Sequence, residues 1–436
     1  MAQRLQAHLP AARLLVAYSG GRDSHVLLHA LASVRDGLPP LAAVHIDHGL
    51  QATSAAWAAH CRQVCQALGV DYLGRQVTVR AAPGESPEAA ARRARYRALR
   101  QCVEQGTLLL TAHHRDDQAE TLLLQLLRGA GPHGLAAMPE AAAFGDGLHL
   151  RPLLDYSRAQ LARYAAGQML HWIDDPSNED TRFDRNHLRH ALIPGIAERW
   201  PGAGRALARA AGHQAEAAAL LDQLAAGDLV QAAGTTPGTL SIASLLTMDG
   251  PRRRNLLRYW LKEKGLPLPN AARLLHIEQN VLRARADAEP LVHWPGAEVR
   301  RYRDALYAGP PLPPIDPEFA VEWSLTGPLI LPDGTRLRAR RGEGEGIRLA
   351  CCPGGRVTVR YRRGGERCRP AGRGGTRPLK KLLQEQGVPP WARERLPLLY
   401  HGAALLAVAG VLVCEPAGAA PSEPGGVIVR EGGGWP

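Results

Sequence analysis

The first part of the chain alternates short apolar runs with longer segments of helical periodicity. The apolar runs predict strands at Arg13–Tyr18, Leu41–Asp47, Asp71–Val79 and Thr107–Ala112. The segments beside them predict helices at Ser24–Val34, Ser54–Leu68, Glu88–Gln105 and Asp116–Arg128. Strands separated by helices predict an α/β fold with a doubly wound parallel sheet, which binds ligands at the carboxyl ends of its strands.

The hydrophobic pattern changes after residue 202. Helical periodicity continues through Ala203–Ala226, Arg252–Lys262 and Ala271–Arg285, which predicts a helical second domain over residues 203–308. The Pro-rich stretch Gly309–Pro317 predicts a stiff linker. Beyond it, short alternating segments with Gly-rich turns predict a small α+β domain over residues 318–430. The first domain then covers residues 1–202.

The net charge of the chain indicates what kind of partner it binds. The 436 residues carry a formal net charge of +12, which favours a polyanion such as RNA or DNA as partner, or less often an anionic membrane surface. Nearly all basic residues are arginine. Arginine suits bidentate phosphate binding, but a GC-rich genome would equally explain the excess of Arg over Lys. The genome does not explain the excess of positive charge.

Cysteine usage and the apolar runs exclude several classes of protein. The seven cysteines form no CxxC pair, so a disulfide framework, a zinc site and an iron–sulfur site are not expected. We expect most of them to be small core residues in a reducing cytoplasm. The N-terminus lacks a signal-peptide pattern, and no apolar run is long enough to span a membrane.

A Gly-rich loop follows the first predicted strand and begins the first long helix. It reads SGGRDS, with Ser19, Gly20, Gly21, Arg22, Asp23 and Ser24 in order. The glycines let phosphate approach the backbone, the serines offer hydroxyl donors, and the helix N-terminus attracts anions. Asp23 could cap the helix or help to hold a phosphate-bound Mg²⁺.

The same loop has a simpler interpretation as an ordinary strand–turn–helix junction, and it lacks the GKS or GKT of a Walker A loop. The complete hexapeptide in this position favours nucleotide binding. SGGRDS resembles the SGGxDS signature of the PP-loop ATP pyrophosphatases, which cleave ATP between the α and β phosphates and form an adenylated intermediate. That resemblance implies that Asp47 and His48, after the second strand, lie beside adenine and ribose. Otherwise they are a turn pair.

Acidic residues lie at the start of the predicted helix Asp116–Arg128. Asp117 and Glu120 are three residues apart on one helix face, beside Asp116. Acids at a helix start often only compensate the helix dipole. A pair on one face near the phosphate loop would instead make a receptor for an ammonium group.

Two arginine-rich segments are candidates for anion contacts. Arg92, Arg95 and Tyr96 share one helical stripe, which on spacing alone is more typical of a solvated face with local ion pairs. The functional alternative aims these arginines at phosphate or carboxylate. After the turn signature DPSN, we expect a basic helical surface for an RNA backbone, formed by Arg182, Arg185, Arg189 and His190.

Together these segments resemble the tRNA(Ile)-lysidine synthetase family over nearly the whole chain. The matching blocks are AHHRDDQAET, LRGAGPHGL, RPLL, DPSN…RN…R, the region from RRRNLLRYWL to GAEVRRYRDALY, and the C-terminal VTVRYRRGGERCRP…LKKLLQEQGVPPWARERLPLL. SGGxDS alone indicates only the superfamily, whereas the AHHxDDQxET block and the two later domains indicate the member.

The resemblance implies an ATP-dependent ligase that acts on the wobble cytidine of an isoleucine tRNA with a CAU anticodon. ATP adenylates O2 of the cytosine, and the ε-amine of free lysine then attacks C2 and displaces AMP. Asp117 and Glu120 would bind the lysine, Asp23 would lie near Mg²⁺, and Arg92 or Arg95 would face the reacting groups. The C-terminal arginines, among them Arg360, Arg363 and Arg367, would contact the acceptor stem, although they also fit a charged hairpin.

Three alternatives remain beside this interpretation. A tRNA thiolase of the same superfamily would require a catalytic cysteine or a CxxC pair beside the loop, and an amidating relative would require an amidotransferase domain. A non-catalytic RNA-binding protein that only senses ATP would not require the intact carboxylates. We expect a cytoplasmic protein with no obligate protein partner, and a homodimer is left open.

Overall fold

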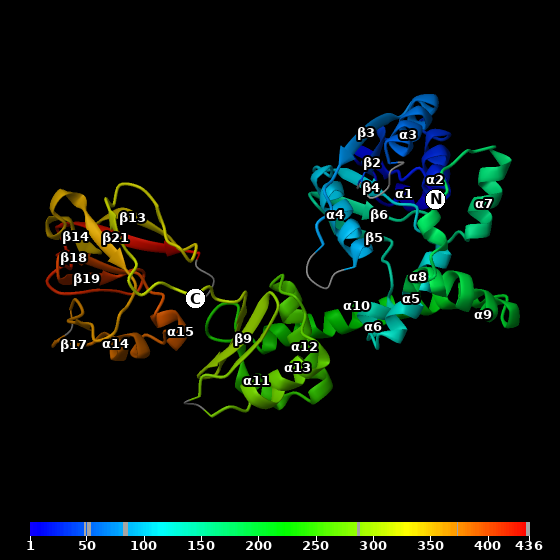
Figure 1. Cartoon of the computed structure of the whole chain (residues 1–436). Helices are drawn as coiled ribbons and strands as arrows, with labels where there is room; N and C mark the ends of the chain where they lie inside the picture. Colours follow the sequence, from blue (N-terminus) through cyan, green and yellow to red (C-terminus); the bar gives the residue numbers. More distant parts are fainter. Residues whose placement is uncertain (48, 50–53, 82–85, 286–287, 373, 433–436) are drawn as a thin grey trace. The chain divides into compact units, whose positions relative to one another are not determined.

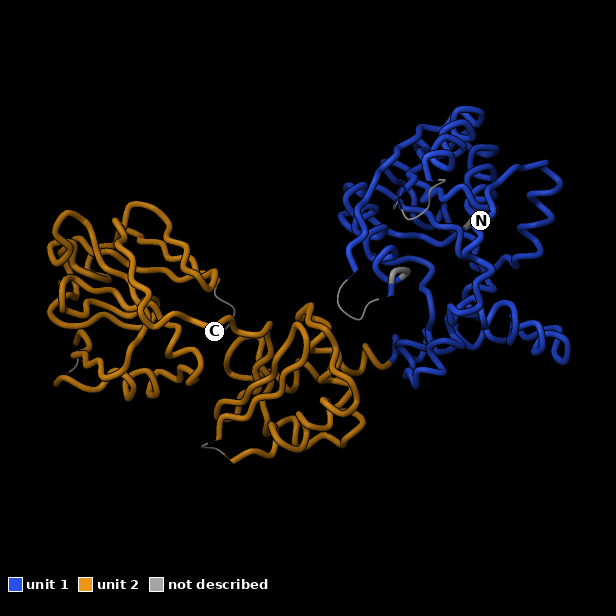
Figure 2. Tube along the Cα trace, in the orientation of Figure 1, with its two compact units in different colours: residues 1–220 blue, residues 221–436 orange. Residues whose placement is uncertain are grey.

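The computed structural model describes residues 1–47, 49, 54–81, 86–285, 288–372 and 374–432. These residues form two compact units, Met1–Leu220 and Leu221–Pro436 (Figure 2). The division falls inside the long helix α10 (Ala203–Gln231), so the predicted domain boundary after residue 202 stays a prediction. Among the described residues, no helix has the length and apolar character that a membrane span requires.

The first unit is built on a six-stranded sheet with the strand order β3-β2-β1-β4-β6-β5 (Figure 1). Its strands are β1 (Arg13–Ala17), β2 (Leu41–Asp47), β3 (Asp71–Gln76), β4 (Thr107–Leu110), β5 (Ala141–Phe144) and β6 (Gly147–Leu150). All neighbours pair in parallel except β5 and β6, which form an antiparallel hairpin. The four predicted strands and the doubly wound parallel sheet are therefore confirmed, and the hairpin adds an edge that the apolar pattern did not predict.

Helices cover both faces of this sheet because the side chains of each strand alternate between them. Leu14 and Val16 of β1 pack with α2 (Arg22–Ala32), α3 (Ser54–Leu68) and α7 (Arg158–Gly167). Leu15 points to the other face and packs with α4 (Pro87–Gln101). The two cores hold the carboxyl ends of β1, β2 and β4 in fixed register.

The remaining helices of this unit are short, apart from α5 and α10. They are α1 (Ala2–Gln6), α5 (Arg115–Leu127), α6 (Pro132–Leu135), a 3-10 turn (Pro176–Glu179), α8 (Asp184–His187), a π-helical turn (Leu188–Leu192) and α9 (Ile193–Arg199). The predicted helix Asp116–Arg128 corresponds to α5, which begins at Arg115 directly after the AHH segment. Its N-terminus therefore lies next to the end of β4.

The first half of the second unit is not purely helical, so the expectation of a helical domain over residues 203–308 is wrong in part. Its helices are α11 (Ile242–Thr247), α12 (Gly250–Glu263), α13 (Ala271–His276) and a π-helical turn (Ile277–Val281). Its strands are β7 (Leu240–Ser241), β8 (Leu291–Trp294), β9 (Ala297–Tyr302) and β10 (Ala305–Gly309). The strands form an antiparallel sheet that shares one apolar core with the helices. Strands of two to six residues gave too weak a signal beside the long helices.

The second half confirms the expected α+β class. One sheet has the order β11-β15-β18-β19-β20 and another the order β12-β13-β21-β14, and Val359, Leu337 and Ile428 belong to the core that they share. The strands are β11 (Ala320–Trp323), β12 (Leu329–Ile330), β13 (Arg336–Glu343), β14 (Ile347–Arg348), β15 (Val357–Arg360), β16 (Arg367–Cys368), β17 (Arg377–Pro378), β18 (Leu398–His401), β19 (Ala404–Val408), β20 (Leu412–Val413) and β21 (Pro424–Glu431). The helical elements are α14 (Leu379–Glu385), α15 (Pro390–Arg393) and 3-10 turns at Leu349–Cys351 and Pro353–Gly355.

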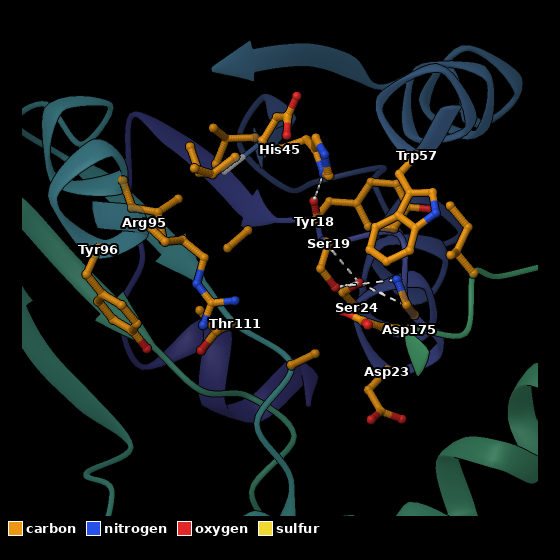
Figure 3. A pocket seen from close by; sticks show the side chains of 18 of the residues that line it. Tyr18, Ser19, Asp23, Ser24, His45, Trp57, Arg95, Tyr96, Thr111 and Asp175 are labelled. Atoms are coloured by element: carbon orange, nitrogen blue, oxygen red, sulfur yellow. Dashed lines mark hydrogen bonds between the residues drawn. The ribbon is translucent and has the colours of Figure 1, made fainter. Parts of the chain in front are cut away.

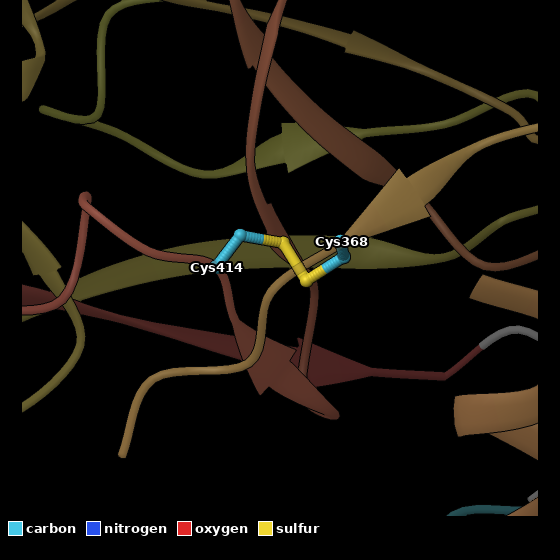
Figure 4. Close-up of a disulfide and its surroundings, with 2 residues drawn as sticks. All are labelled: Cys368 and Cys414. Carbon is cyan, nitrogen blue, oxygen red and sulfur yellow. A yellow bond between two sulfur atoms is a disulfide. The ribbon is translucent and has the colours of Figure 1, made fainter. Parts of the chain in front are cut away.

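Cys368 and Cys414 form a disulfide, which contradicts the expectation for this pair (Figure 4). Both are buried, and they are separated by 46 residues in sequence with their Cα atoms 5.7 Å apart. A bridge between Pro370 and Cys414 brings the two segments together. No sequence spacing reveals such a long-range contact. The other described cysteines are free, and Cys61, Cys65 and Cys352 are buried, as expected for core residues.

Candidate active site

A cavity of about 340 Å³ opens at the carboxyl ends of β1, β2 and β4 (Figure 3). Ligand cavities commonly measure ~300–1,000 Å³, so this one can accept a nucleotide-sized group. Six of the residues predicted from the sequence line it: Ser19, Gly21, Asp23, Ser24, Asp47 and Arg95. This position at the strand ends is where doubly wound sheets bind ligands.

The phosphate loop is held in shape by its own serines. The Ser24 hydroxyl donates to the Gly21 carbonyl at 2.9 Å and accepts from the Ser19 amide at 3.3 Å, while the two hydroxyl oxygens lie 3.0 Å apart. Gly21 is the N-cap of α2, and glycine has no side chain that could cap the first amides of that helix. These amides and the positive end of the helix dipole point to an anion at this position.

Gly20 has a backbone conformation that other residues avoid. Its φ is +84°, in the left-handed region. A Cβ atom at this position would lie 3.0 Å from Sγ of the buried Cys61 and 3.6 Å from Cδ1 of Ile173. The loop therefore requires glycine here both for its backbone angle and for the space against α3.

We expect Gly20→Ala to raise the KM for ATP by at least about tenfold, because a shift of about 1 Å in a positioning group can cost up to about 100-fold. Gly37→Ala is the matched control. Gly37 has a φ of +86°, but its Cβ would meet no described atom within 4 Å. Both variants carry a similar backbone cost, so an equal effect of the two on the KM for ATP would contradict a specific role for Gly20.

Asp23 is ionised and lies between two basic groups. Burial alone would raise the pKa of its carboxyl group, but His114 and Arg22 lower that pKa to about 2. One carboxylate oxygen accepts from Arg22 Nε at 3.1 Å, and the other lies 3.5 Å from Nε2 of His114. A charged carboxylate at the rim of the cavity can give one oxygen ligand to a hard divalent cation.

Asp117 closes a capping box at the start of α5. Its Oδ2 accepts from the His114 amide at 2.9 Å, and Nδ1 of His114 accepts from the Asp117 amide at 3.4 Å. Burial would raise the pKa of Asp117, but His114, Arg185 and His113 lower it overall. This carboxylate is therefore charged, and it joins the cap to the basic residues described next.

Glu120 is 1% exposed and lies in a cluster of arginines. Arg185 Nε donates to it at 2.7 Å, Arg189 Nε at 2.8 Å, and Arg158 lies 3.5 Å away. Arg185 also donates to Oδ1 of Asp117 at 3.0 Å. The predicted acidic pair is thus present and close to the loop-bearing sheet edge, but guanidinium groups already neutralise it.

These contacts show where the side chains of Arg185 and Arg189 lie, and their contact with tRNA stays a prediction. The expected outward basic surface is not formed by these two side chains, which are 27% and 18% exposed and turn toward Asp117 and Glu120. The physical reason is charge neutralisation, because a buried carboxylate without partners is costly. The pairing joins residues that are 65–69 positions apart.

The two candidate catalytic arginines lie differently. Arg95 lines the cavity, and Figure 3 shows its side chain extending past Tyr96 toward Thr111. Arg92 lies over the ring of Tyr96, 5.0 Å from its centre, and does not line the cavity. Of the two, Arg95 is therefore placed to meet a ligand.

The cavity also contains residues that the sequence motifs did not indicate as site residues. Among them are Trp57 of α3, Thr111 and His113 after β4, and Asp175 and Asn178 of the DPSN turn. The DPSN segment was interpreted only as a turn and as one block of the family pattern, and Trp57 had no local signal. The predicted nucleotide contact His48 lies outside the described residues, whereas Asp47 lines the cavity and accepts from the Gly49 amide at 2.8 Å.

A nucleotide-sized cavity at the end of a parallel sheet, with an uncapped Gly-Gly helix start, is typical of the PP-loop class. In agreement with this, residues 1–196 match the PP-loop domain. Residues 240–307 match the TilS substrate binding domain, and residues 357–429 match the TilS substrate C-terminal domain.

Close relatives identify the family. The tRNA(Ile)-lysidine synthase of Alkalilimnicola ehrlichii is 47% identical over 94% of this chain and 92% of its own length. The enzyme of the same name from Methylococcus capsulatus is 45% identical over 92% of each. The chain belongs to the tRNA(Ile)-lysidine synthase family. Among solved structures, a U34-tRNA thiolase from Methanococcus maripaludis overlaps 49% of this chain and 77% of its own, with 14% identity and a TM-score of 0.42.

Proposed function

We propose that this protein ligates free lysine to C2 of the wobble cytidine in an isoleucine tRNA with a CAU anticodon. ATP first adenylates O2 of the cytosine and releases pyrophosphate, and the lysine ε-amine then displaces AMP. The observation that carries this proposal is the cavity beside the SGGRDS loop in a chain that has all three domains of its family, in order. tRNA is the polyanion that the net charge of +12 would serve.

ATP would bind with its phosphates on the loop and the N-terminus of α2. Gly20 and Gly21 leave the backbone open, and the hydroxyls of Ser19 and Ser24 can turn from each other to phosphate oxygens. Arg22 adds positive charge beside the loop. The end of β2, with Asp47, and the indole of Trp57 offer a mixed polar and apolar wall for ribose and adenine.

Mg²⁺ would bind with ATP through the phosphates and one carboxylate oxygen of Asp23. The lowered pKa keeps that oxygen charged at neutral pH, which suits a hard cation. No group of three or more acidic, His or Cys side chains in the described residues forms a metal site by itself. The ion would therefore depend on the nucleotide for most of its ligands.

Arg95 would stabilise negative charge that develops during adenylation. Preorganised charge in a partly closed cavity is the expected main source of rate in such a displacement at phosphorus. Arg92 would support Arg95 indirectly, since both lie over the ring of Tyr96. The cytosine must leave its stack to reach this depth.

Lysine would bind at Asp117 and Glu120 through its ammonium group. Because Arg185 and Arg189 occupy these carboxylates, the ammonium can pair with them only after at least one guanidinium moves away. The site would therefore change its ion pairs when substrates bind.

The tRNA would also contact arginines of the second unit. Arg363 and Arg367 are exposed, and Arg360 lies over the ring of Tyr400, 3.8 Å from its centre. Arg185 and Arg189 could join the tRNA contact only by leaving Glu120. We place the acceptor-stem contact on the C-terminal arginines, of which Arg363 pairs with Glu318 at 2.8 Å and would exchange that carboxylate for a phosphate.

The experiment is uptake of labelled lysine into a CAU-anticodon isoleucine tRNA transcript, with ATP and Mg²⁺, by the wild type and Asp117→Asn. Asn keeps an oxygen that caps α5 but removes the charge. We expect ATP-dependent uptake by the wild type, and a higher KM for lysine in the variant with little change in the KM for ATP. Lack of uptake with continued tRNA-dependent release of pyrophosphate would indicate another nucleophile. Lack of both would favour a protein that only senses ATP.

A further inference from the structure

A chain of four buried or half-buried polar side chains leads from the hairpin β5–β6 to the cavity. Arg151 NH2 lies 3.2 Å from Nδ1 of His149, Nε2 of His149 lies 2.8 Å from Oγ1 of Thr111, and that oxygen lies 2.8 Å from Nδ1 of His113. His113 and Thr111 line the cavity, and His149 does not. This series of hydrogen bonds includes no residue of the phosphate loop and neither Asp117 nor Glu120.

Arg151, at the buried end of this series, sets the direction of its hydrogen bonds. A guanidinium group can only donate, so Nδ1 of His149 must accept. The ring proton of His149 then lies on Nε2 and is donated to Thr111. Arg151 itself is fixed, since its NH1 donates to the Pro139 carbonyl at 2.6 Å.

Thr111 then determines which ring nitrogen of His113 accepts a hydrogen bond. Its oxygen accepts from His149, and its single hydroxyl proton then has Nδ1 of His113 as its acceptor. Since Nδ1 of His113 accepts, the ring proton of neutral His113 lies on Nε2. Among the described residues, Nε2 of His113 has no hydrogen-bond partner, so its N–H is left for a ligand in the cavity.

The charges around both rings favour their neutral forms. Burial lowers the pKa of His113 to about 3, with Arg151, Arg185 and Arg92 also lowering it and Asp117 opposing them. Burial lowers the pKa of His149 to about 4, and Arg151 and Arg92 act in the same direction. Both rings are therefore neutral imidazoles near pH 7, each with one proton to place.

We propose that His113 is a hydrogen-bond donor to an anionic oxygen of a bound substrate, and that His149 is the positioning residue that fixes it in this tautomer. His113 is thus not the base that deprotonates the attacking amine. The catalytic use of this donor rests on the proposed function, whereas the tautomer itself does not. The anionic oxygen belongs either to an ATP phosphate or to the carboxylate of free lysine.

The first test reads the tautomer directly. The ¹⁵N shifts of His113, assigned with a His113→Gln variant of the labelled full chain, should show a protonated Nε2 and an unprotonated Nδ1. The opposite assignment, or an even mixture of tautomers, would overturn the proposal even if lysine uptake is normal. Correct tautomers without lysine uptake would instead count against the proposed function alone.

Ligand additions identify the acceptor. A non-hydrolysable ATP analogue should shift Nε2 of His113 if the acceptor is a phosphate, and lysine should shift it if the acceptor is the carboxylate. If neither addition, alone or together with the other, moves this signal, the ligand part of the proposal is wrong.

Two substitutions at His149 test whether this residue positions His113 or only fills space in the core. In His149→Gln the amide oxygen can accept from Arg151 and the amide nitrogen can donate to Thr111, so the direction of the chain is kept. In His149→Glu the carboxylate accepts from both neighbours, which turns the Thr111 proton away from His113. We expect His149→Gln to stay within about threefold of the wild-type kcat/KM, and His149→Glu to lose about 100-fold, as for the loss of one preorganised donor.

The two variants should also differ in the tautomer of His113, which should reverse only in His149→Glu. Equal losses of activity with unchanged tautomers in both variants would show that His149 only fills space, and would overturn its positioning role. If His149→Glu does not fold, Thr111→Val interrupts the same chain without adding charge. Thr111→Val should then raise the KM of the substrate that shifts the Nε2 signal of His113. The KM of the other substrate should stay unchanged.

Discussion

Glu120→Gln is expected to destabilise the first unit by about 3–5 kcal/mol at pH 7, the cost typical of removing one partner from a buried ion pair. The substitution keeps the shape of the side chain. It removes the carboxylate that Arg185, Arg189 and Arg158 share in a largely buried site, and so leaves their positive charges less well neutralised. The free energy of unfolding from urea denaturation measures this loss.

Glu140→Gln is the matched control for this prediction. Glu140 pairs with Arg4 at 3.1 Å, but its side chain is 40% exposed. Exposed pairs contribute little, so we expect a loss of less than about 1 kcal/mol. If Glu120→Gln falls in the same range as the control, the arginine cluster does not hold the segment 184–199 against α5.

Arg95→Ala is expected to lower kcat/KM for the ligation by about 100- to 1,000-fold, because it removes a preorganised charge from the cavity. The effect should appear mainly in kcat, since the charge is most useful when negative charge develops at phosphorus. Steady-state release of pyrophosphate with saturating tRNA measures the first step directly.

Arg92→Ala provides the comparison, because both arginines lie over Tyr96 but only Arg95 lines the cavity. We expect Arg92→Ala to lose less than about tenfold. The assignment of the two residues is wrong if Arg92→Ala is the more damaging variant.

Much of the first unit could be predicted from local patterns. Buried strands such as Leu41–Asp47 are apolar because both faces of a parallel sheet are covered, and the SGGRDS loop combines a strand end, two glycines and a helix start in one short segment. The hairpin β5–β6 was missed because Ala141–Phe144 and Gly147–Leu150 are short and contain small residues. It nevertheless supplies His149.

Pairings between distant segments could not be predicted. Spacing placed Asp117 and Glu120 on one face of a helix, but not the arginines that turn back onto that face from more than sixty residues away. The Cys368–Cys414 disulfide, which joins residues 46 positions apart, could not be predicted for the same reason. Such contacts depend on how elements pack, which composition and periodicity do not record.

The most direct test of the central claim is nucleoside analysis of the tRNA after reaction with ATP, Mg²⁺ and lysine. We predict that a CAU-anticodon isoleucine transcript loses its wobble cytidine and gains one nucleoside with the mass of cytidine joined to lysine with loss of water. One AMP and one pyrophosphate should form for each nucleoside converted. An unchanged wobble cytidine, or a wobble nucleoside that carries sulfur instead of lysine, would contradict the account.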